Sequence, residues 1–312
     1  MGNCEVSSAV TMHIGIYEFK TNNVIGSSQY GVVYKGYPIN NHGFSVAIKC
    51  LNQPFSEKDF KEVRPTLVKL GAIENPNISK YTDYYHDVAN SKLYIISEYF
   101  SYGNLNDLLM NELKLDPVED LRTAITYCQQ LISGLLALHK NNIIHGRLNP
   151  KNVLVDCRKL KINDFGLYKL YRRDKKRKPK GSVYDAPELF QGLVKPNEKT
   201  DIWSLGVIMY HLIYKVNPLK IMAGEHVFYN LLWGKCEVFD DLAKMCLALD
   251  PLERISRQDL ENHPFLSMDP QKIEYLPGHW RNMRSVDMPS PSPHTAYKMF
   301  HQMEIGFNVS HG

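Results

Sequence analysis

Two segments near the N-terminus carry residues that could bind phosphate groups. The residues from Gly26 to Val33 have the sequence GSSQYGVV and lie between two expected strands. Glycines at such a turn let backbone N–H groups approach phosphate oxygens closely. Because Ser28 replaces the middle glycine of the usual pattern, an ordinary turn is an equal alternative. Lys49 ends the apolar segment Val46–Ile48 and is of the type that pairs with nucleotide phosphates, although a surface lysine at a strand end is the alternative.

Four further motifs follow in a fixed order. They are HGRLNPKN from His145 to Asn152, DFG from Asp164 to Gly166, APE from Ala186 to Glu188 and DIWSLG from Asp201 to Gly206. Each motif alone is a weak signal, but their order and spacing together leave little room for chance.

These motifs resemble those of the eukaryotic protein kinase family over about residues 17–266. The resemblance is closest to the serine/threonine kinases and, in Leu135–His139 and Ile143–His145, to the branch that initiates autophagy. It implies an α+β, bilobal protein kinase fold with a small β-rich N-lobe and a larger helical C-lobe. It also implies a pocket for ATP with Mg²⁺.

The resemblance assigns the phosphate and metal positions of that pocket. The glycine-rich turn would be formed by Gly26, Ser28 and Gly31. Lys49 matches the strand lysine of the family, with Glu62 as its carboxylate partner, although a solvent-facing Glu62 is the alternative. Asn152 and Asp164 match the two magnesium ligands, and their side-chain oxygens suit a hard cation.

The resemblance also assigns the residues around the adenine. Val33, Ala47 and Leu154 match the positions that sandwich the base. Any one of them alone is better explained as a core residue, but as a set they favour an intact pocket. The hinge would be Glu98 to Phe100, whose backbone would hydrogen-bond adenine, and Ser97 would be a small gatekeeper.

The catalytic loop departs from the family at its most important position. Arg147 stands where the catalytic aspartate is expected, and Asn149 stands where the loop lysine is expected. An arginine is always protonated and has no acceptor lone pair, so it cannot accept the proton of an attacking hydroxyl. Losing a positioned base slows a reaction by roughly 10²–10⁴-fold.

The sequence therefore predicts a pseudokinase that keeps an ATP and magnesium pocket and acts as a scaffold or allosteric partner. Two alternatives are a weak or unconventional serine/threonine kinase and a structural assembly component that uses the kinase fold. Glu188 is expected to pair with Arg254, and Asp201 is expected to anchor the catalytic-loop backbone. These three residues concern folding rather than chemistry.

Two further segments suggest partners. A dense positive run could bind an acidic protein tail or an anionic surface, or be a solvated loop; it contains Arg172, Arg173, Lys175, Lys176, Arg177 and Lys178. Gly146 replaces the arginine that would receive an added phosphate in active relatives. Gly2 and Cys4 resemble an acylation signal, although Val6 stands where Ser or Thr is usual. A protein partner is expected, and no specific nucleic acid.

The elements that would position these residues follow from the pattern of apolar residues. Short β-rich segments separated by turns extend from Tyr17 to Tyr99, with one helix that starts near Ser56, and helical periods dominate from Leu105. The expected organisation is a flexible leader at 1–15, the N-lobe with hinge at 16–100, the C-lobe at 101–267 and a Pro/Ser-containing tail at 268–312.

Composition places few limits on function. The 312 residues are 44% hydrophobic with a formal net charge of +4, so global charge favours no particular partner. The six cysteines have no C-x-x-C spacing, which suits a reducing compartment. No apolar run approaches the roughly 18–20 residues of a membrane helix. We expect a cytoplasmic protein, with membrane or cytoskeletal association as an open alternative.

Overall fold

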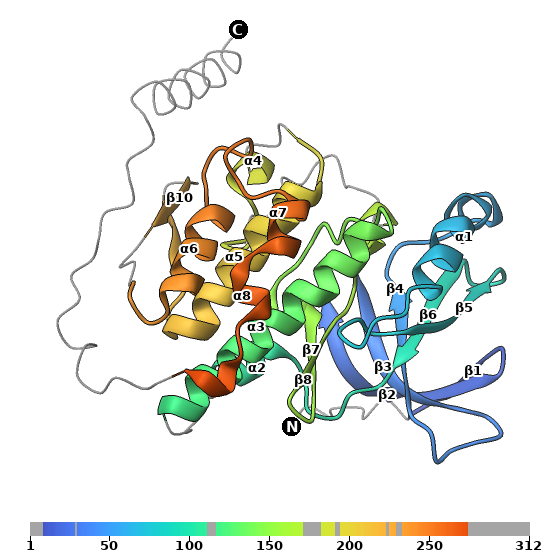
Figure 1. The fold of residues 1–312 in the computed structure, drawn as a ribbon. Coiled ribbons are helices and arrows are strands. Elements are labelled where there is room, and N and C mark those ends of the chain that lie inside the picture. The colour runs from blue at the N-terminus through green and yellow to red at the C-terminus, as the bar shows by residue number, and fades with distance from the viewer. Residues whose placement is uncertain are drawn as a thin grey trace, which may run out of the picture.

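A six-stranded antiparallel sheet forms the N-terminal lobe of the computed structural model (Figure 1). Its spatial order is β1 (Thr11–Ile14), β2 (Tyr17–Ser28), β3 (Gly31–Pro38), β4 (Val46–Leu51), β6 (Lys92–Glu98) and β5 (Tyr81–Asp87). Val46 and Ile48 of β4 are buried in a small core on one face of the sheet. Because side chains alternate along a strand, Ala47 and Lys49 face the other side.

Helix α1 (Glu57–Gly71) lies against β5 and begins with a capping box. The Ser56 hydroxyl accepts the N–H of Asp59 at 3.2 Å, and the Asp59 carboxylate accepts the N–H of Ser56 at 3.0 Å. These bonds satisfy N–H groups that a helix start leaves without an intrahelical partner. The start expected at Ser56 is thereby confirmed.

Strand β1 corrects the expected N-terminal boundary. Residues 1–15 were expected to be a flexible leader, yet Thr11–Ile14 pair with Tyr17–Lys20 of β2. Gly15, at a φ of +57°, allows the tight turn between the two strands. Ile14 is 1% exposed and belongs to the core of the sheet, so burial of its side chain favours this extra strand.

The second lobe is larger and mostly helical. Its first part comprises α2 (Leu105–Met110), α3 (Pro117–Lys140), the 3₁₀ turn η1 (Pro150–Asn152), β7 (Val153–Asp156), β8 (Lys159–Ile162) and the 3₁₀ turn η2 (Leu167–Lys169). Its second part comprises α4 (Pro187–Phe190), α5 (Glu198–Tyr214), β9 (Leu219–Met222), β10 (Glu225–Phe228), α6 (Glu237–Cys246), α7 (Arg257–Asn262), α8 (Pro264–Ser267) and η3 (Pro270–Lys272). The two-lobed α+β architecture expected from the sequence is confirmed (Figure 1).

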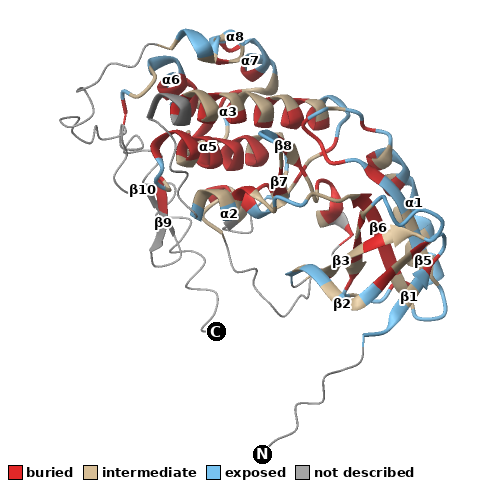
Figure 2. Ribbon diagram, turned by 90° about the horizontal axis from the view of Figure 1, so that it is seen from below, coloured by how far each residue is buried: buried red, intermediate tan, exposed pale blue. Residues whose placement is uncertain are grey.

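Helix α5 is the centre of this lobe. Almost all of its residues are buried, as the red ribbon of α5 in Figure 2 shows, and Trp203 and Tyr210 are fully enclosed. A helix that is apolar on all sides needs neighbours on all sides. Helices α3 and α6 pack directly against it. This rigid centre carries Asp201, which reaches the catalytic loop.

The end of the second lobe lies beyond the expected boundary at residue 267. Gln129 of α3 donates its Nε2 hydrogens to the carbonyls of Phe265 at 3.0 Å and Met268 at 2.8 Å. The guanidinium of Arg122 donates to the carbonyl of Ile273 at 3.5 Å. The first residues of the expected tail are therefore attached to α3.

The structure describes residues 9–28, 30–110, 117–170, 182–190, 194–222, 225–228 and 233–273. No helix within these ranges is long and apolar enough to span a membrane. The positive run from Arg172 to Lys178, the residues Gly2 and Cys4, and the tail after Ile273 lie outside the described residues. The predictions made for them stay predictions.

Candidate functional site

An ion pair between Lys49 and Asp164 joins the two lobes. Lys49 projects from β4 and donates to Asp164 Oδ2, in the loop that follows β8. The two side chains are only 11% and 23% exposed. A lysine and an aspartate that were both predicted to be site residues are thus brought into direct contact.

The loop that carries Asp164 is held in an uncommon backbone conformation. Asp164 has a φ of +59°, a region that residues with a side chain seldom occupy. Phe165, which is fully buried, stacks on Tyr81 with 4.7 Å between ring centroids. A Cβ on Gly166 would lie 2.8 Å from a methyl group of Leu70 in α1. Tight packing of Phe165 and Gly166 therefore holds Asp164 in this uncommon backbone conformation. Such conformations are found most often at functional sites.

The expected pair between Lys49 and Glu62 is not formed, which corrects that prediction. Glu62 is an exposed residue of α1, and Lys49 pairs with Asp164 instead. From the second turn onward, the inward face of α1 carries Val63, Thr66, Leu67 and Leu70, none of which is acidic. The helix therefore presents no carboxylate to the strand lysine.

Asp201 anchors the catalytic loop, as expected. Its carboxylate accepts the backbone N–H groups of His145 and Gly146, both at 2.8 Å, and contacts Nε2 of His139 at 3.0 Å. Burial lowers the pKa of His145, and this effect outweighs the opposing influence of Asp201. The neutral ring also suits its contact with the N–H of Arg147, for which Nδ1 is the acceptor at 3.3 Å.

Arg147 projects from this loop to the N-terminal lobe. Its guanidinium carbon lies 3.6 Å from the centre of the Tyr30 ring, at the glycine-rich turn. Its backbone carbonyl accepts the Nδ2 groups of Asn149 and Asn152, each at 2.9 Å. Asn149 Oδ1 also accepts the N–H of Lys151 at 3.0 Å and so caps η1. Asn149 therefore has a local structural role.

Asn152 and Asp164 are neighbours in the structure. The N–H of Asn163, directly before Asp164, donates to the carbonyl of Asn152 at 2.8 Å. Mg²⁺ is usually held by one or two protein oxygens together with substrate phosphates and water. The described residues contain no group of three or more His, Cys, Asp or Glu arranged to hold a metal ion. The amide oxygen of Asn152 and the carboxylate of Asp164 are two donors of the type that holds magnesium together with a nucleotide.

The glycine-rich turn is a tight hairpin between β2 and β3. Gly26 pairs with Val33, and Ser28 pairs with Gly31. A Cβ on Gly31 would lie 2.5 Å from the carbonyl oxygen of Cys50, so only glycine fits there. Ser28 stands where the usual pattern has its middle glycine, and its hydroxyl accepts the N–H of Tyr30 at 3.2 Å. Ser28 therefore supports the turn itself.

The residues assigned to adenine lie in both lobes. Val33 and Ala47 are half-buried, in contrast to the fully buried Ile48 on the other face of β4. Ala47 is paired with Ser97, which is 8% exposed, and Val33 is paired with Lys49. Leu154 of β7 is the half-buried residue on the side of the helical lobe. Val33 and Ala47 lie next to Lys49 in the sheet, whereas Leu154 belongs to the helical lobe.

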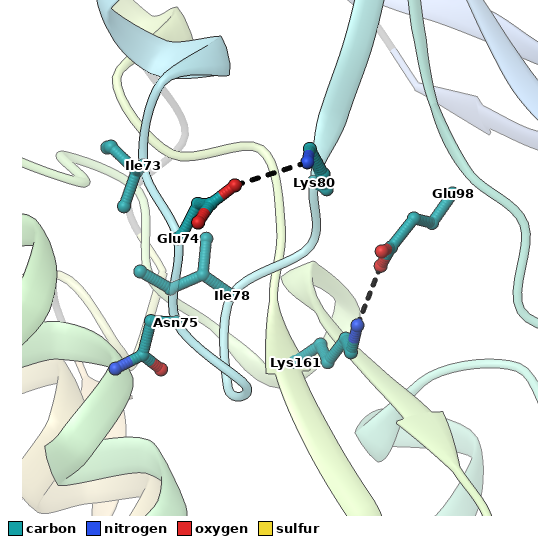
Figure 3. A pocket seen from close by; sticks show the side chains of 7 residues that line it. All are labelled: Ile73, Glu74, Asn75, Ile78, Lys80, Glu98 and Lys161. Atoms are coloured by element: carbon teal, nitrogen blue, oxygen red, sulfur yellow. Dashed lines mark hydrogen bonds and ion pairs between the residues drawn. The ribbon is translucent and has the colours of Figure 1, made fainter.

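Glu98, the first residue of the hinge, lines a pocket of about 180 Å³ (Figure 3). Glu98 accepts from Lys161 of β8 at 2.8 Å, and Lys80 donates to Glu74 at 3.4 Å across the same pocket. The ammonium of Lys161 also lies 5.3 Å from the centre of the Phe100 ring. The side chain of Glu98 is therefore occupied by an interlobe ion pair, and any adenine contact of the hinge would come from its backbone.

Tyr168 and Gly146 form a contact that sequence patterns did not indicate. Gly146 has a φ of +75°, and a Cβ there would overlap the ring of Tyr168 in η2. The aromatic ring thus occupies the space that a side chain at 146 would need. Tyr30 is a second residue missed from sequence, because nothing local to it indicates its contact with Arg147.

The pair between Glu188 and Arg254 is confirmed as a structural element. The guanidinium of Arg254 donates to both carboxylate oxygens of Glu188, at 2.7 and 3.2 Å, and to the carbonyl of Lys199 at 2.8 Å. Arg254 is 1% exposed and lies over the Trp203 ring. A buried, bidentate pair of this kind connects α4 to the segment before α7.

Known proteins match almost the whole described chain. A family model described as the protein kinase domain matches residues 19–266. The calcium/calmodulin-dependent protein kinase type I of Schizosaccharomyces pombe is 30% identical over 276 residues, which cover 80% of this chain and 78% of that protein. The Aurora kinase of Yarrowia lipolytica is 28% identical over 264 residues, covering 80% and 68% of the two proteins.

A third relative is much longer than this chain. The probable serine/threonine-protein kinase MARK-A of Dictyostelium discoideum is 28% identical over 287 residues. The match covers 86% of this chain but only 26% of that protein.

Proposed function

We propose, from the premise that this chain belongs to the protein kinase family, that it is a pseudokinase of the serine/threonine type. It binds Mg-ATP between its lobes and acts as a scaffold or allosteric partner instead of transferring phosphate. Placement near the branch that initiates autophagy is part of the same proposal. One observation supports this proposal most strongly. Asp201 anchors the backbone of His145 and Gly146, and the next residue, Arg147, carries a guanidinium where a catalytic carboxylate is expected.

The absence of a base at this position opposes phosphate transfer. A guanidinium cannot accept the proton of a hydroxyl. The neighbouring Asn149 has an uncharged side chain, so it cannot pair with a phosphate as the expected lysine would. The nearest acids in sequence have other places: Asp185 accepts the N–H of Ser182 at 2.9 Å, and Asp156 ends strand β7. Losing a positioned base raises the barrier by roughly 3–5 kcal/mol.

Nucleotide binding is supported by the residues that remain. Lys49 can bind phosphates, and Asn152 and Asp164 can supply two oxygen ligands. Magnesium bound there would neutralise phosphate charge. Because these residues are all kept, the second candidate is a weak serine/threonine kinase. The structural-component alternative predicts no nucleotide binding at all.

Two measurements on the full chain test this function. A phosphotransfer assay with generic protein substrates should show no turnover near the roughly 1–100 s⁻¹ of active kinases. Thermal unfolding in the presence of Mg-ATP should show stabilisation, which a mixture without magnesium should not reproduce. Ordinary turnover would refute the pseudokinase proposal, and no stabilisation at millimolar Mg-ATP would favour the structural component.

A further inference from the structure

The tip of the β2–β3 hairpin is held in place by hydrogen bonds from two directions. Within the turn, the Ser28 hydroxyl accepts the N–H of Tyr30 and donates to the carbonyl of Gly31 at 3.3 Å. From the end of β4, the backbone N–H of Asn52 donates to the carbonyl of Tyr30 at 2.9 Å. Asn52 Nδ2 also donates to the carbonyl of Ser28 at 3.3 Å. The backbone of Tyr30 is therefore fixed relative to the sheet.

The backbone of Arg147 is fixed in the same way from the other lobe. Its N–H donates to His145 Nδ1, and its carbonyl accepts two asparagine side chains. The ring of Tyr30 covers the face of the guanidinium at 3.6 Å, well inside the roughly 6 Å range of a cation–π contact. Two fixed backbones thus hold an aromatic ring and a planar cation together across the lobes.

The guanidinium that lies over the Tyr30 ring is also a group that binds phosphate. A guanidinium carries its N–H donors in its plane, as a fork that fits phosphate oxygens. The backbone carbonyl of Arg147 accepts the Nδ2 group of Asn152, one of the two proposed metal donors, and Lys49 contacts the other donor, Asp164. Each proposed metal donor therefore contacts a residue with a cationic side chain, Lys49 from the N-terminal lobe and Arg147 from the catalytic loop.

We propose that Arg147 is the receptor for the terminal phosphate of a nucleoside triphosphate and that Tyr30 is the positioning residue that holds its guanidinium. The inference rests on the proposed function and deepens it, because it makes the site selective for triphosphates over diphosphates. The arginine that removes catalysis thereby provides ligand recognition.

Binding of Mg-ATP and Mg-ADP to the full chain, measured by calorimetry, tests the proposal. Hydrogen bonds to charged groups contribute enough for the wild type to prefer Mg-ATP by about 10- to 100-fold. Arg147→Ala should abolish the preference, because it weakens Mg-ATP binding more than Mg-ADP binding. Arg147→Lys should lose most of it, because an ammonium neither forks nor stacks as a guanidinium does. Inorganic phosphate alone should not displace the nucleotide.

Variants of Tyr30 test its positioning role. Tyr30→Ala should reduce the preference by about 2- to 30-fold, which is the range of a cation–π contact. Tyr30→Phe keeps the ring and should retain the wild-type preference. The matched control Tyr85→Ala removes an N-lobe tyrosine, 37% exposed on β5, and should change neither affinity. Thermal unfolding without ligand shows which variants are folded.

The possible failures are distinguishable. Equal affinity of the wild type for the two nucleotides, or a full preference retained by Arg147→Ala, overturns the role of Arg147. A full preference retained by Tyr30→Ala overturns the role of Tyr30. If the folded wild type and the folded Tyr30→Ala both bind neither nucleotide, the proposed function itself fails, and this inference fails with it.

Discussion

The contact between Gly146 and Tyr168 predicts a large effect of a single methyl group. Gly146→Ala places a Cβ at a φ of +75°, where a side chain costs about 1–2 kcal/mol. The same Cβ overlaps the half-buried Tyr168 ring, and overpacking of this kind adds about 1–3 kcal/mol. The sum of about 2–5 kcal/mol corresponds to a fall of roughly 4–20 °C in Tm for a protein of this size.

Thermal unfolding followed by circular dichroism measures this effect. Gly43→Ala is the matched control, since Gly43 is exposed and its nearest contact is 3.4 Å away, so its Tm should change little. In Gly146→Ala/Tyr168→Ala the overlap is relieved but the backbone strain remains. The double variant should therefore lose about 1–3 kcal/mol less unfolding free energy than the two single variants lose when their losses are added. A Gly146→Ala protein as stable as Gly43→Ala would refute the reasoning.

Three further outcomes are expected. Lys49→Met should abolish the stabilisation by Mg-ATP, which amounts to about 2.7 kcal/mol for the wild type at a ligand concentration of about 100 times Kd. Glu62→Ala should leave this stabilisation unchanged. Its loss in Glu62→Ala would restore Glu62 as a site residue. Arg254→Ala should cost about 3–5 kcal/mol in urea unfolding, because it leaves the Glu188 carboxylate without its buried cation. A cost under about 1 kcal/mol would contradict this structural role. The pKa of His145 is lowered in the folded protein, so the unfolded chain binds a proton more readily than the folded one. The free energy of unfolding should therefore fall as pH decreases below about 6.5, and His145→Gln should make this dependence on pH weaker. An unchanged dependence would show that His145 does not cause it.

The sequence was sufficient where a function depends on residues close together along the chain. The order of the glycine-rich turn, Lys49, the catalytic loop and the DFG motif predicted the two-lobed fold. The capping box at Ser56 was visible for the same reason, since its partner Asp59 is three residues away. The loss of the base at position 147 is a property of one residue type and needs no structure.

The sequence was insufficient where side chains from distant segments meet. Glu62 was assigned by its type, but the register of α1 turns it to solvent and places Thr66 and Leu67 on the inward face. Strand β1 was missed because only Ile14 of its four residues is buried, so its apolar pattern is weak. The contact between Tyr30 and Arg147 depends on the approach of the two lobes, which no local pattern encodes.

Each catalytic-loop residue that differs from the kinase pattern makes a local contact of its own. These contacts explain why the loop is well packed although it lacks the usual catalytic residues. At 146 the missing side chain is replaced by the Tyr168 ring, at 147 the guanidinium stacks on Tyr30, and at 149 the asparagine caps η1. A lysine at 149 would remove that cap, which costs about 0.5–2 kcal/mol. An aspartate at 147 would remove the stacking cation from Tyr30. Restoring the two catalytic residue types therefore withdraws two local supports at once, so the loop holds its present form more stably than it would hold a restored catalytic one.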